Sequence, residues 1–337
     1  EIAQCLVGSE MCIRDRAGCS RIKKILICKR QIYSFIKIGV SMTKKYHFCS
    51  RNNVLLNIAG GLLVLSTLLS GCGVLPAFEL KQENPMQTAI SQELPVGEAV
   101  VMRDTKVPYS VPAGVSVLMY HMVGDEEGNA AVITEENFDK QMRYLKEHGY
   151  HPITMQELYD YVTKGSTLPE KPVCITFDDG YADNYTIVYP LMKKYGFPWT
   201  LYLITGEVGK PNRMTWEQLK EMAESHTVTI ANHTVTHPKL GQLPSRLDKE
   251  KEIRGAQEAL AKELGVHTTW ISYPYGDYDQ ETMDICKELG IKLAVIMSDG
   301  RVHVNDNPLE LHRVWVGNEV TLEHLEDRLH HDDYIKI

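Results

Sequence analysis

Two observations in the sequence predict an α/β protein with parallel strands and a site at the strand ends. Seven short apolar runs alternate with helical patterns after residue 113, which is typical of a parallel α/β protein. Such a chain can form either a closed barrel or a doubly wound sheet. Polar side chains follow several of the runs directly, and in a barrel the chemistry sits where the strands end. This favours one shared pocket, in a single catalytic domain over residues 113–337.

The predicted strands are short apolar runs, and capping residues or glycines bound most of the predicted helices. In chain order the strands cover residues 115–121, 173–177, 199–204, 228–231, 270–273, 293–297 and 311–316. Thr154 with Glu157 forms a capping box, which predicts a helix start. The helices cover residues 134–149, 154–165, about 182–195, a stretch from 215, 245–265, 279–289 and 321–329.

Charge separates the first 71 residues from the rest. They carry eleven Lys and Arg against three Asp and Glu, whereas the chain from Cys72 onward carries 25 against 41, a net charge of −16. An acidic body of this kind disfavours binding to a nucleic-acid backbone, so no nucleic-acid partner is expected. The eight cysteines form no CxxC pair, which argues against a structural zinc site or a dithiol redox centre.

Residues 42–71 have the pattern of a secretory signal peptide. Basic residues follow Met42, an apolar run covers residues 54–69, and small residues precede Cys72. This ending resembles a bacterial lipobox, which predicts cleavage before Cys72 and lipid modification of that cysteine. The alternative is an uncleaved signal anchor, because the run with its flanks approaches the roughly 20 residues that span a bilayer.

The segments on either side of this leader carry no recognisable chemistry. Residues 1–41 contain no pattern that is expected before a signal peptide, and we interpret them as an artefact or a non-native leader. Residues 72–112 are polar with scattered prolines. This composition favours a tether that holds the catalytic domain away from the lipid surface.

Two adjacent carboxylates follow the second predicted strand, in the run Thr176-Phe177-Asp178-Asp179-Gly180. Neighbouring side chains at a strand end point to different sides, so the two acids can have different roles. Like charges this close raise each other's proton affinity unless a cation lies between them. The pair is therefore either an ordinary exposed turn or part of a site with a positive partner.

A pair of histidines follows the fourth predicted strand. His233 and His237 are four residues apart, and on one helical turn this spacing lets both rings face one metal ion. The same spacing also arises by chance. Combined with an acid from another strand end, the pair gives a His-His-Asp set with coordination positions open for a water and a substrate oxygen.

Together, Thr176-Phe177-Asp178-Asp179-Gly180 and His233-Thr234-Val235-Thr236-His237 resemble the first two motifs of the polysaccharide deacetylases, carbohydrate esterase family 4. The resemblance covers roughly residues 115–330. It implies a distorted barrel of about seven β/α units, in agreement with the strand count.

The resemblance also implies roles for individual residues. Asp179, His233 and His237 would bind a divalent metal, with zinc as the expected ion, and Asp178 would be the general base. A metal of this kind polarises a carbonyl and acidifies water. The backbone N–H at Tyr275, in the family's third motif, would help to hold the oxyanion of the tetrahedral intermediate.

The chain departs from the family in this third motif, which usually begins with an arginine that pairs with the catalytic base. The corresponding stretch here is Ser272-Tyr273-Pro274-Tyr275-Gly276. We hypothesise that Arg313, on the last predicted strand, supplies the missing charge. The alternative is that Arg313 forms a salt bridge at the surface or at a strand end.

Two histidines are candidates for the general acid, because the family's C-terminal Leu-x-His motif is unclear in this chain. Leu311-His312-Arg313 is a weak match, since His312 should face away from Arg313 on an alternating strand. The run Leu118-Met119-Tyr120-His121 resembles the opening strand of the secreted poly-N-acetylglucosamine deacetylase branch, where a histidine at this place lies in the active site. We favour His121 as the acid; a hydrogen-bonded strand-end histidine is the alternative.

The sequence therefore predicts a metal-dependent hydrolase that deacetylates N-acetylglucosamine units of an extracytoplasmic polysaccharide, either poly-N-acetylglucosamine or peptidoglycan. We expect a monomer, anchored through lipid to the membrane of a bacterium. Two other functions remain compatible with the residues. One is O-deacetylation of acetylated xylan-type glycans, and the other is glycan binding by a module whose site has decayed, as the missing third-motif arginine suggests.

Overall fold

The computed structural model describes residues 95–125 and 128–334 with their side chains and, ahead of them, only the backbone of four short strands. β1 (Ala3–Val7) pairs with β2 (Glu10–Arg14), and β3 (Leu55–Ala59) with β4 (Leu62–Ser66). Cys72 lies outside the described residues, so its lipidation stays a prediction. Within the described part of the chain, no helix has the length and apolarity needed to cross a membrane.

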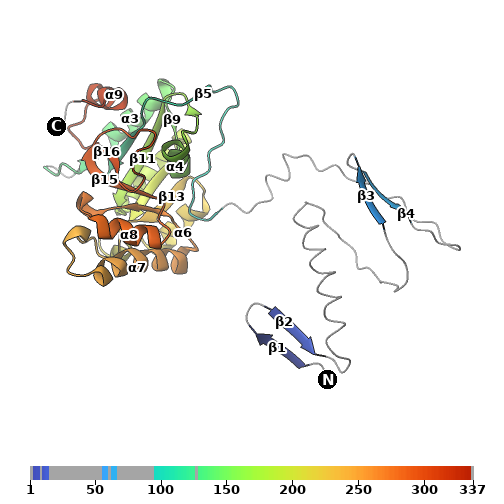
Figure 1. Cartoon of the computed structure of the whole chain (residues 1–337). Helices are drawn as coiled ribbons and strands as arrows, with labels where there is room; N and C mark the ends of the chain where they lie inside the picture. The colour runs from blue at the N-terminus through green and yellow to red at the C-terminus, as the bar shows by residue number, and fades with distance from the viewer. Residues whose placement is uncertain are drawn as a thin grey trace. The chain divides into compact units, whose positions relative to one another are not determined.

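Seven parallel strands close into a barrel, which confirms the predicted fold (Figure 1). The last strand returns to pair with the first, and β9 (His151–Pro152) adds to the sheet beside the second. The barrel strands are, in order around the barrel and along the chain, β6 (Ser116–Tyr120), β11 (Pro172–Asp179), β12 (Trp199–Leu203), β13 (Val228–Asn232), β14 (Trp270–Ser272), β15 (Leu293–Asp299) and β16 (Leu311–Trp315).

Helices flank the barrel (Figure 1). They are α3 (Glu135–Glu147), α4 (Met155–Lys164), α5 (Tyr189–Tyr195), α6 (Trp216–Glu224), α7 (Arg246–Leu264), α8 (Gln280–Glu288) and α9 (Leu322–His330). The shorter elements are β5 (Tyr109–Ser110) paired with β10 (Leu168–Pro169), β7 (Met122–Val123) paired with β8 (Val132–Ile133), the π-helical turn η1 (Asn184–Val188), and the 3-10 turns η2 (Thr205–Glu207), η3 (Leu240–Gln242) and η4 (Pro274–Gly276).

Most predicted helix ends are confirmed, but one predicted helix is divided. The capping box of Thr154 and Glu157 is present, and Gly165 and Gly265 end their helices in the left-handed conformation. The helix expected over residues 182–195 instead consists of η1 followed by α5. Pro190, in the first turn of α5, has no N–H to donate to the preceding turn, so a single continuous α-helix would lose a hydrogen bond there.

Alternation along the strands distributes the side chains between two cores. On β11, Ile175 and Phe177 join the large cluster between the barrel and its helices, whereas Cys174 joins a second cluster inside the barrel. Asp178 has the same parity as Cys174 and therefore points into the barrel. On β16, Leu311 lies in the interior cluster, so Arg313 points inward as well.

Residues 97–100, which we expected to belong to the tether, pack into the barrel wall beside β13. β13 and β14 pair at a single position, Asn232 with Ile271. The Gly97 carbonyl accepts the Ile230 N–H at 2.8 Å, and the Glu98 carboxylate accepts the Trp270 indole N–H at 3.0 Å. The segment thus lies between the two strands where they diverge, and the folded domain begins before the predicted boundary at residue 113.

Gly97→Ala is expected to lower the free energy of unfolding by about 1–3 kcal/mol. Gly97 has φ 71°, and a Cβ there would lie 2.4 Å from Cγ2 of Val266. Gly149→Ala is the matched control, because Gly149 has the same φ of 71° but no atom within 4 Å of its Cβ position. Urea denaturation compares the two variants. Equal losses would show that the packing of Gly97 on the barrel contributes nothing beyond backbone strain.

Candidate active site

The backbone turns sharply where β11 ends, and this separates the two aspartates. Asp178 keeps the direction of the strand and faces the barrel interior, whereas Asp179 has φ 77° and Gly180 φ 80°. A Cβ at Gly180 would lie 2.4 Å from Cδ1 of Leu203, so glycine is required at this position for two reasons. The turn directs Asp179 towards the histidines that follow β13.

His233 and His237 converge, but not on the helical turn that their spacing suggested. They lie on a loop in which Thr234 and His237 adopt positive φ values of 65° and 61°. Asn232 Oδ1 accepts the Thr234 N–H at 2.7 Å, and the Thr234 hydroxyl accepts the His237 N–H at 3.0 Å. These local hydrogen bonds fold the chain back on itself, which brings the two rings together without a helix.

A helix outside the barrel holds this loop in place. Glu252, on α7, accepts the backbone N–H groups of Val235 and Thr236 at 3.0 and 2.8 Å, and the Thr236 hydroxyl at 2.7 Å. The sequence analysis did not identify Glu252 as important for the site. No motif marks it, because a glutamate at the exposed edge of a long helix looks like any solvated charge.

The two imidazoles and Asp179 have the geometry of a metal site. Their ligand atoms lie within 4.8 Å of one another. Nε2 of His233 is 3.2 Å from Nε2 of His237, and Asp179 Oδ1 is 3.4 and 3.5 Å from the two nitrogens. In a tetrahedral zinc site with bonds of about 2.0–2.1 Å, ligand atoms are about 3.3–3.4 Å apart. The residues therefore fit a metal ion of this size.

Hydrogen bonding and charge around the three residues favour a cation. His233 Nδ1 lies 2.7 Å from the Ser272 carbonyl, so Nδ1 carries the proton and Nε2 presents its lone pair. Asp179 Oδ1 is buried and has no hydrogen-bond partner among the described residues. Burial lowers the pKa of His233, but the Asp178 and Asp179 carboxylates more than offset this and raise it, so positive charge is stabilised at this point.

The pKa values of the other two members are lowered. Burial and the neighbouring His233 lower the pKa of His237 to about 4, which leaves a neutral ring able to bind metal. Burial on its own would raise the pKa of Asp179, but the interaction with the nearby His233 lowers it, so Asp179 is a carboxylate at neutral pH. His237 and Asp179 are therefore in the protonation states that metal binding requires.

Arg313 lies inside the barrel and forms a bidentate ion pair with Asp178. Nη1 donates to Oδ1 at 2.7 Å and Nη2 to Oδ2 at 2.6 Å. Both side chains are buried, at 0% and 2% exposure, so the surface salt bridge that we considered for Arg313 is excluded. The other donors are paired too, with Ile296 O at 3.0 Å, Thr176 Oγ1 at 3.3 Å and Ser272 Oγ at 3.0 Å.

Ser272 occupies the position where the third motif usually has its arginine, and it contacts both partners. Its hydroxyl donates to Asp178 Oδ2 at 3.1 Å and accepts from Arg313 Nη2. A small side chain here leaves room for the guanidinium to reach Asp178 from β16, which only β15 separates from β14. Burial raises the pKa of Asp178, but Arg313 and His233 outweigh it and lower the pKa to about 2.

Of the two candidate acids, only His121 lies near the acid pair. Its ring is partly buried and packs against Trp315, with ring centroids 5.3 Å apart. Burial lowers the pKa of His121, and the nearby Asp178 and Asp179 carboxylates partly offset that effect. His312 points to the other face of β16, where Nδ1 lies 3.2 Å from the Ser298 carbonyl. Its position outside the barrel agrees with the strand alternation.

Tyr275 borders the metal-binding residues. Its backbone is in the left-handed region, with φ 60°, and its side chain is 55% exposed. The ring lies against His237, with centroids 4.6 Å apart, and Lys239 Nζ is 5.6 Å from the ring centre. Tyr202 is completely buried beneath Arg313 and cannot stack on a ligand.

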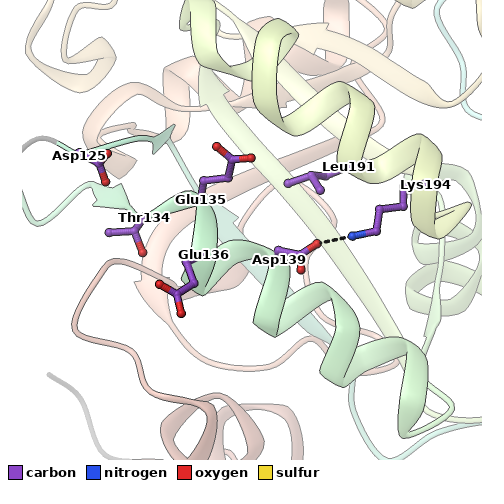
Figure 2. A pocket seen from close by; sticks show the side chains of 7 residues that line it. All are labelled: Asp125, Thr134, Glu135, Glu136, Asp139, Leu191 and Lys194. Atoms are coloured by element: carbon purple, nitrogen blue, oxygen red, sulfur yellow. Dashed lines mark hydrogen bonds and ion pairs between the residues drawn. The ribbon is translucent and has the colours of Figure 1, made fainter.

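A pocket of about 590 Å³ lies elsewhere, between α3 and α5 (Figure 2). Acidic side chains line most of it, and Asp139 is paired with Lys194 at 2.7 Å. None of the predicted catalytic or metal-binding residues belongs to this pocket. The converging side chains at the strand ends, rather than this hollow, therefore define the candidate active site.

Known proteins resemble this chain in sequence and structure. A family model described as polysaccharide deacetylase matches residues 165–294. YxkH of Bacillus subtilis (strain 168), whose name assigns it to the polysaccharide deacetylases, is 34% identical over 258 residues, 74% of this chain and 91% of that protein. The poly-beta-1,6-N-acetyl-D-glucosamine N-deacetylase of Staphylococcus aureus (strain MSSA476) is 27% identical over 222 residues, 62% of this chain and 76% of that protein.

A solved structure extends the likeness to the fold. The deacetylase PplD of Streptococcus pyogenes, in complex with acetate, superposes with a TM-score of 0.62 at 30% identity. The match covers 65% of this chain and 100% of that one. The shared region is thus about the size of the barrel domain.

Proposed function

The chain belongs to the polysaccharide deacetylase family, hydrolases of carbon–nitrogen bonds, and we propose that it removes acetyl groups from N-acetylglucosamine units of an extracytoplasmic polysaccharide with the help of zinc. The observation that carries the proposal is one cluster of side chains. Three ligand atoms that fit a zinc ion lie beside a carboxylate, Asp178, whose Oδ2 is 3.8 Å from Nε2 of His233. The Staphylococcus aureus relative, by its name, acts on an N-acetylglucosamine polymer.

Zinc held by Asp179, His233 and His237 would polarise the amide carbonyl of the substrate and acidify a water molecule. The acidification of the water matters for Asp178, because a carboxylate with a pKa of about 2 is a weak base towards ordinary water. Arg313 fixes the carboxylate in one orientation, with an oxygen lone pair left for the proton. Asp178 then takes a proton from the attacking water as the bond to the carbonyl carbon forms.

The leaving group must be protonated as the carbon–nitrogen bond breaks, since an amide anion is too basic to leave. His121 is the side chain placed to give this proton to the leaving nitrogen, because it lies near both aspartates. The proton that Asp178 has taken from the water restores His121 once the amine has left. The backbone N–H at Tyr275 would stabilise the oxyanion of the tetrahedral intermediate. The products are acetate and a free amine on the sugar. The alternative of a decayed, purely glycan-binding site was motivated by the missing third-motif arginine. The pairing of Asp178 with Arg313 removes that motive.

Acetate release from a panel of glycans tests the proposal. Metal-stripped and zinc-reconstituted protein are assayed on N-acetylglucosamine oligomers, poly-β-1,6-N-acetylglucosamine, peptidoglycan strands and acetylated xylan. Zinc-dependent release from the N-acetylated glycans supports the proposal. Release from acetylated xylan alone would instead indicate an O-deacetylase, and bound glycan with no release from any substrate would indicate a binding module.

We also propose that the protein is anchored to the outer face of the cell membrane through a lipid on Cys72. The signal-peptide pattern of residues 42–71 supports this, and so does a polymeric substrate outside the cytoplasm. The wild-type protein is expected in the membrane fraction as the lipid-modified, cleaved form. Cys72→Ser is expected to accumulate as the unprocessed precursor without lipid, because cleavage and lipid attachment both need the thiol. Cell fractionation and mass measurement check this, and unchanged lipid attachment would exclude Cys72.

A further inference from the structure

We propose that Asn184 is a positioning residue that holds His121 in place for proton transfer. This inference rests on the proposed function, because it requires His121 to be the general acid. No motif in the sequence singled out Asn184. It lies four residues after Gly180, at the start of the π-helical turn η1, and its side chain is completely buried. Turns of this kind are rare and often occur at functional sites.

Asn184 and its neighbour Asp183 hold the chain on both sides of Met122. Nδ2 of Asn184 donates to the His121 carbonyl at 3.0 Å and to Asp183 Oδ1 at 2.8 Å. The same Asp183 oxygen accepts the Val123 N–H at 3.0 Å. We call these three hydrogen bonds the clamp. It fixes the carbonyl before Met122 and the amide after it to a single side-chain pair.

The clamp connects the segment that carries the proposed general acid, His121, to the segment that follows the proposed general base, Asp178. β6 ends at Tyr120, so His121 is the first residue beyond that strand. Asp178 and Asp179 end β11, and the chain reaches Asn184 within one further turn. The position of His121 relative to the two aspartates is therefore set by a contact between the segment that carries the acid and the segment that carries the base.

The imidazole ring of His121 has few contacts of its own. Nδ1 of its ring is buried and has no hydrogen-bond partner in the part of the chain that the structure describes. The ring contact with Trp315, at a tilt of 47°, is a packing contact that leaves rotation and small shifts open. A general acid must lie within hydrogen-bond reach of the atom it protonates, and a misplacement of about 1 Å can cost about 100-fold in rate.

Asn184→Leu tests the proposal, since leucine keeps the branched shape of asparagine and removes the donor. We expect kcat on an N-acetylglucosamine oligomer to fall about tenfold to a hundredfold, with KM within about twofold and the zinc content unchanged. The decisive measurement is the same substitution in a His121→Ala background. If Asn184 acts through His121, kcat of the double variant equals that of His121→Ala alone.

Thr186→Val is the matched control within η1. It removes a hydroxyl that, among the residues the structure describes, bonds only the Ala182 carbonyl, at 3.3 Å, and it should leave kcat unchanged. Asn184→Asp is a second variant in case leucine prevents folding; it keeps a polar side chain of the same shape, and when ionised it cannot donate. The same loss of kcat is expected for it, together with the same equality in the His121→Ala background.

The outcomes separate this inference from the proposed function. If His121→Ala keeps full turnover, His121 is not the acid and the proposed mechanism fails at that residue. If His121→Ala loses turnover but Asn184→Leu does not, the positioning role alone is overturned. Losses that multiply in the double variant overturn it as well, because Asn184 would then act by a route independent of His121.

Discussion

Asp178→Asn is expected to lower kcat by about 10²–10⁴-fold while the protein keeps its zinc, whereas Asp179→Asn should lose both. The two aspartates are adjacent and receive the same substitution, so each is the control for the other. Asp178 faces Arg313 and lies beside the proposed metal position, whereas Asp179 Oδ1 faces both histidine Nε2 atoms. An amide at Asp178 cannot take a proton from water, but it leaves the three ligands unchanged.

Zinc content and kcat are measured on the same preparations, well below the melting temperature of each variant. This precaution is needed because an amide at Asp178 can accept only one of the two guanidinium bonds, which will also lower stability. Equal zinc loss in both variants would contradict the division of roles. Full turnover of Asp178→Asn with bound zinc would exclude Asp178 as the base.

Arg313→Met is expected to lower the free energy of unfolding by about 3–5 kcal/mol and to reduce kcat as well. The side chain of Arg313 is fully buried, and removing it leaves the Asp178 carboxylate in the barrel without its cation. The Ile296 carbonyl and the Thr176 hydroxyl lose a donor too. The base would lose the contact that fixes its orientation, so both stability and turnover depend on this residue.

Three further variants distinguish a buried ion pair from simple packing. Arg313→Lys keeps the charge but not the two-pronged geometry, so an intermediate loss is expected. The double variant Asp178→Leu with Arg313→Met should recover much of the stability, since no unpaired charge remains in the barrel. Arg254→Met, which breaks the exposed pair with Glu250, should cost at most about 0.5 kcal/mol. Urea denaturation gives all four values, and a loss for Arg313→Met no larger than that for Arg254→Met would contradict the proposed role.

Local patterns predicted much of the fold. All seven barrel strands lie where apolar runs are found, because a parallel strand covered on both faces needs a continuous apolar stretch. The helix ends followed from side chains that act within one turn, as with Thr154 and Glu157. The prediction failed for residues 97–100, whose place in the wall depends on the divergence of β13 from β14, a property of the whole barrel.

Asp179, His233 and His237, the candidate metal ligands, converge as predicted, but for a different geometric reason. The spacing of His233 and His237 suggested a helix, whereas a loop with two left-handed residues brings the rings together. The residue types Asn232 and Thr234 could have suggested such a turn, since side chains of these types often accept hydrogen bonds from nearby backbone N–H groups. Glu252, which holds the loop from α7, could not be found from local sequence at all.

The sequence by itself determined the barrel strands, the acid pair and the histidine pair, because each depends on residues close together in the chain. The tertiary structure alone decided what steadies Asp178 and which histidine lies near it. Arg313 is 135 positions from Asp178, and the two meet only because the barrel closes between β16 and β6 and both side chains point inward. Alternation along a strand is a local property, but the side chains that meet inside a barrel depend on its closure.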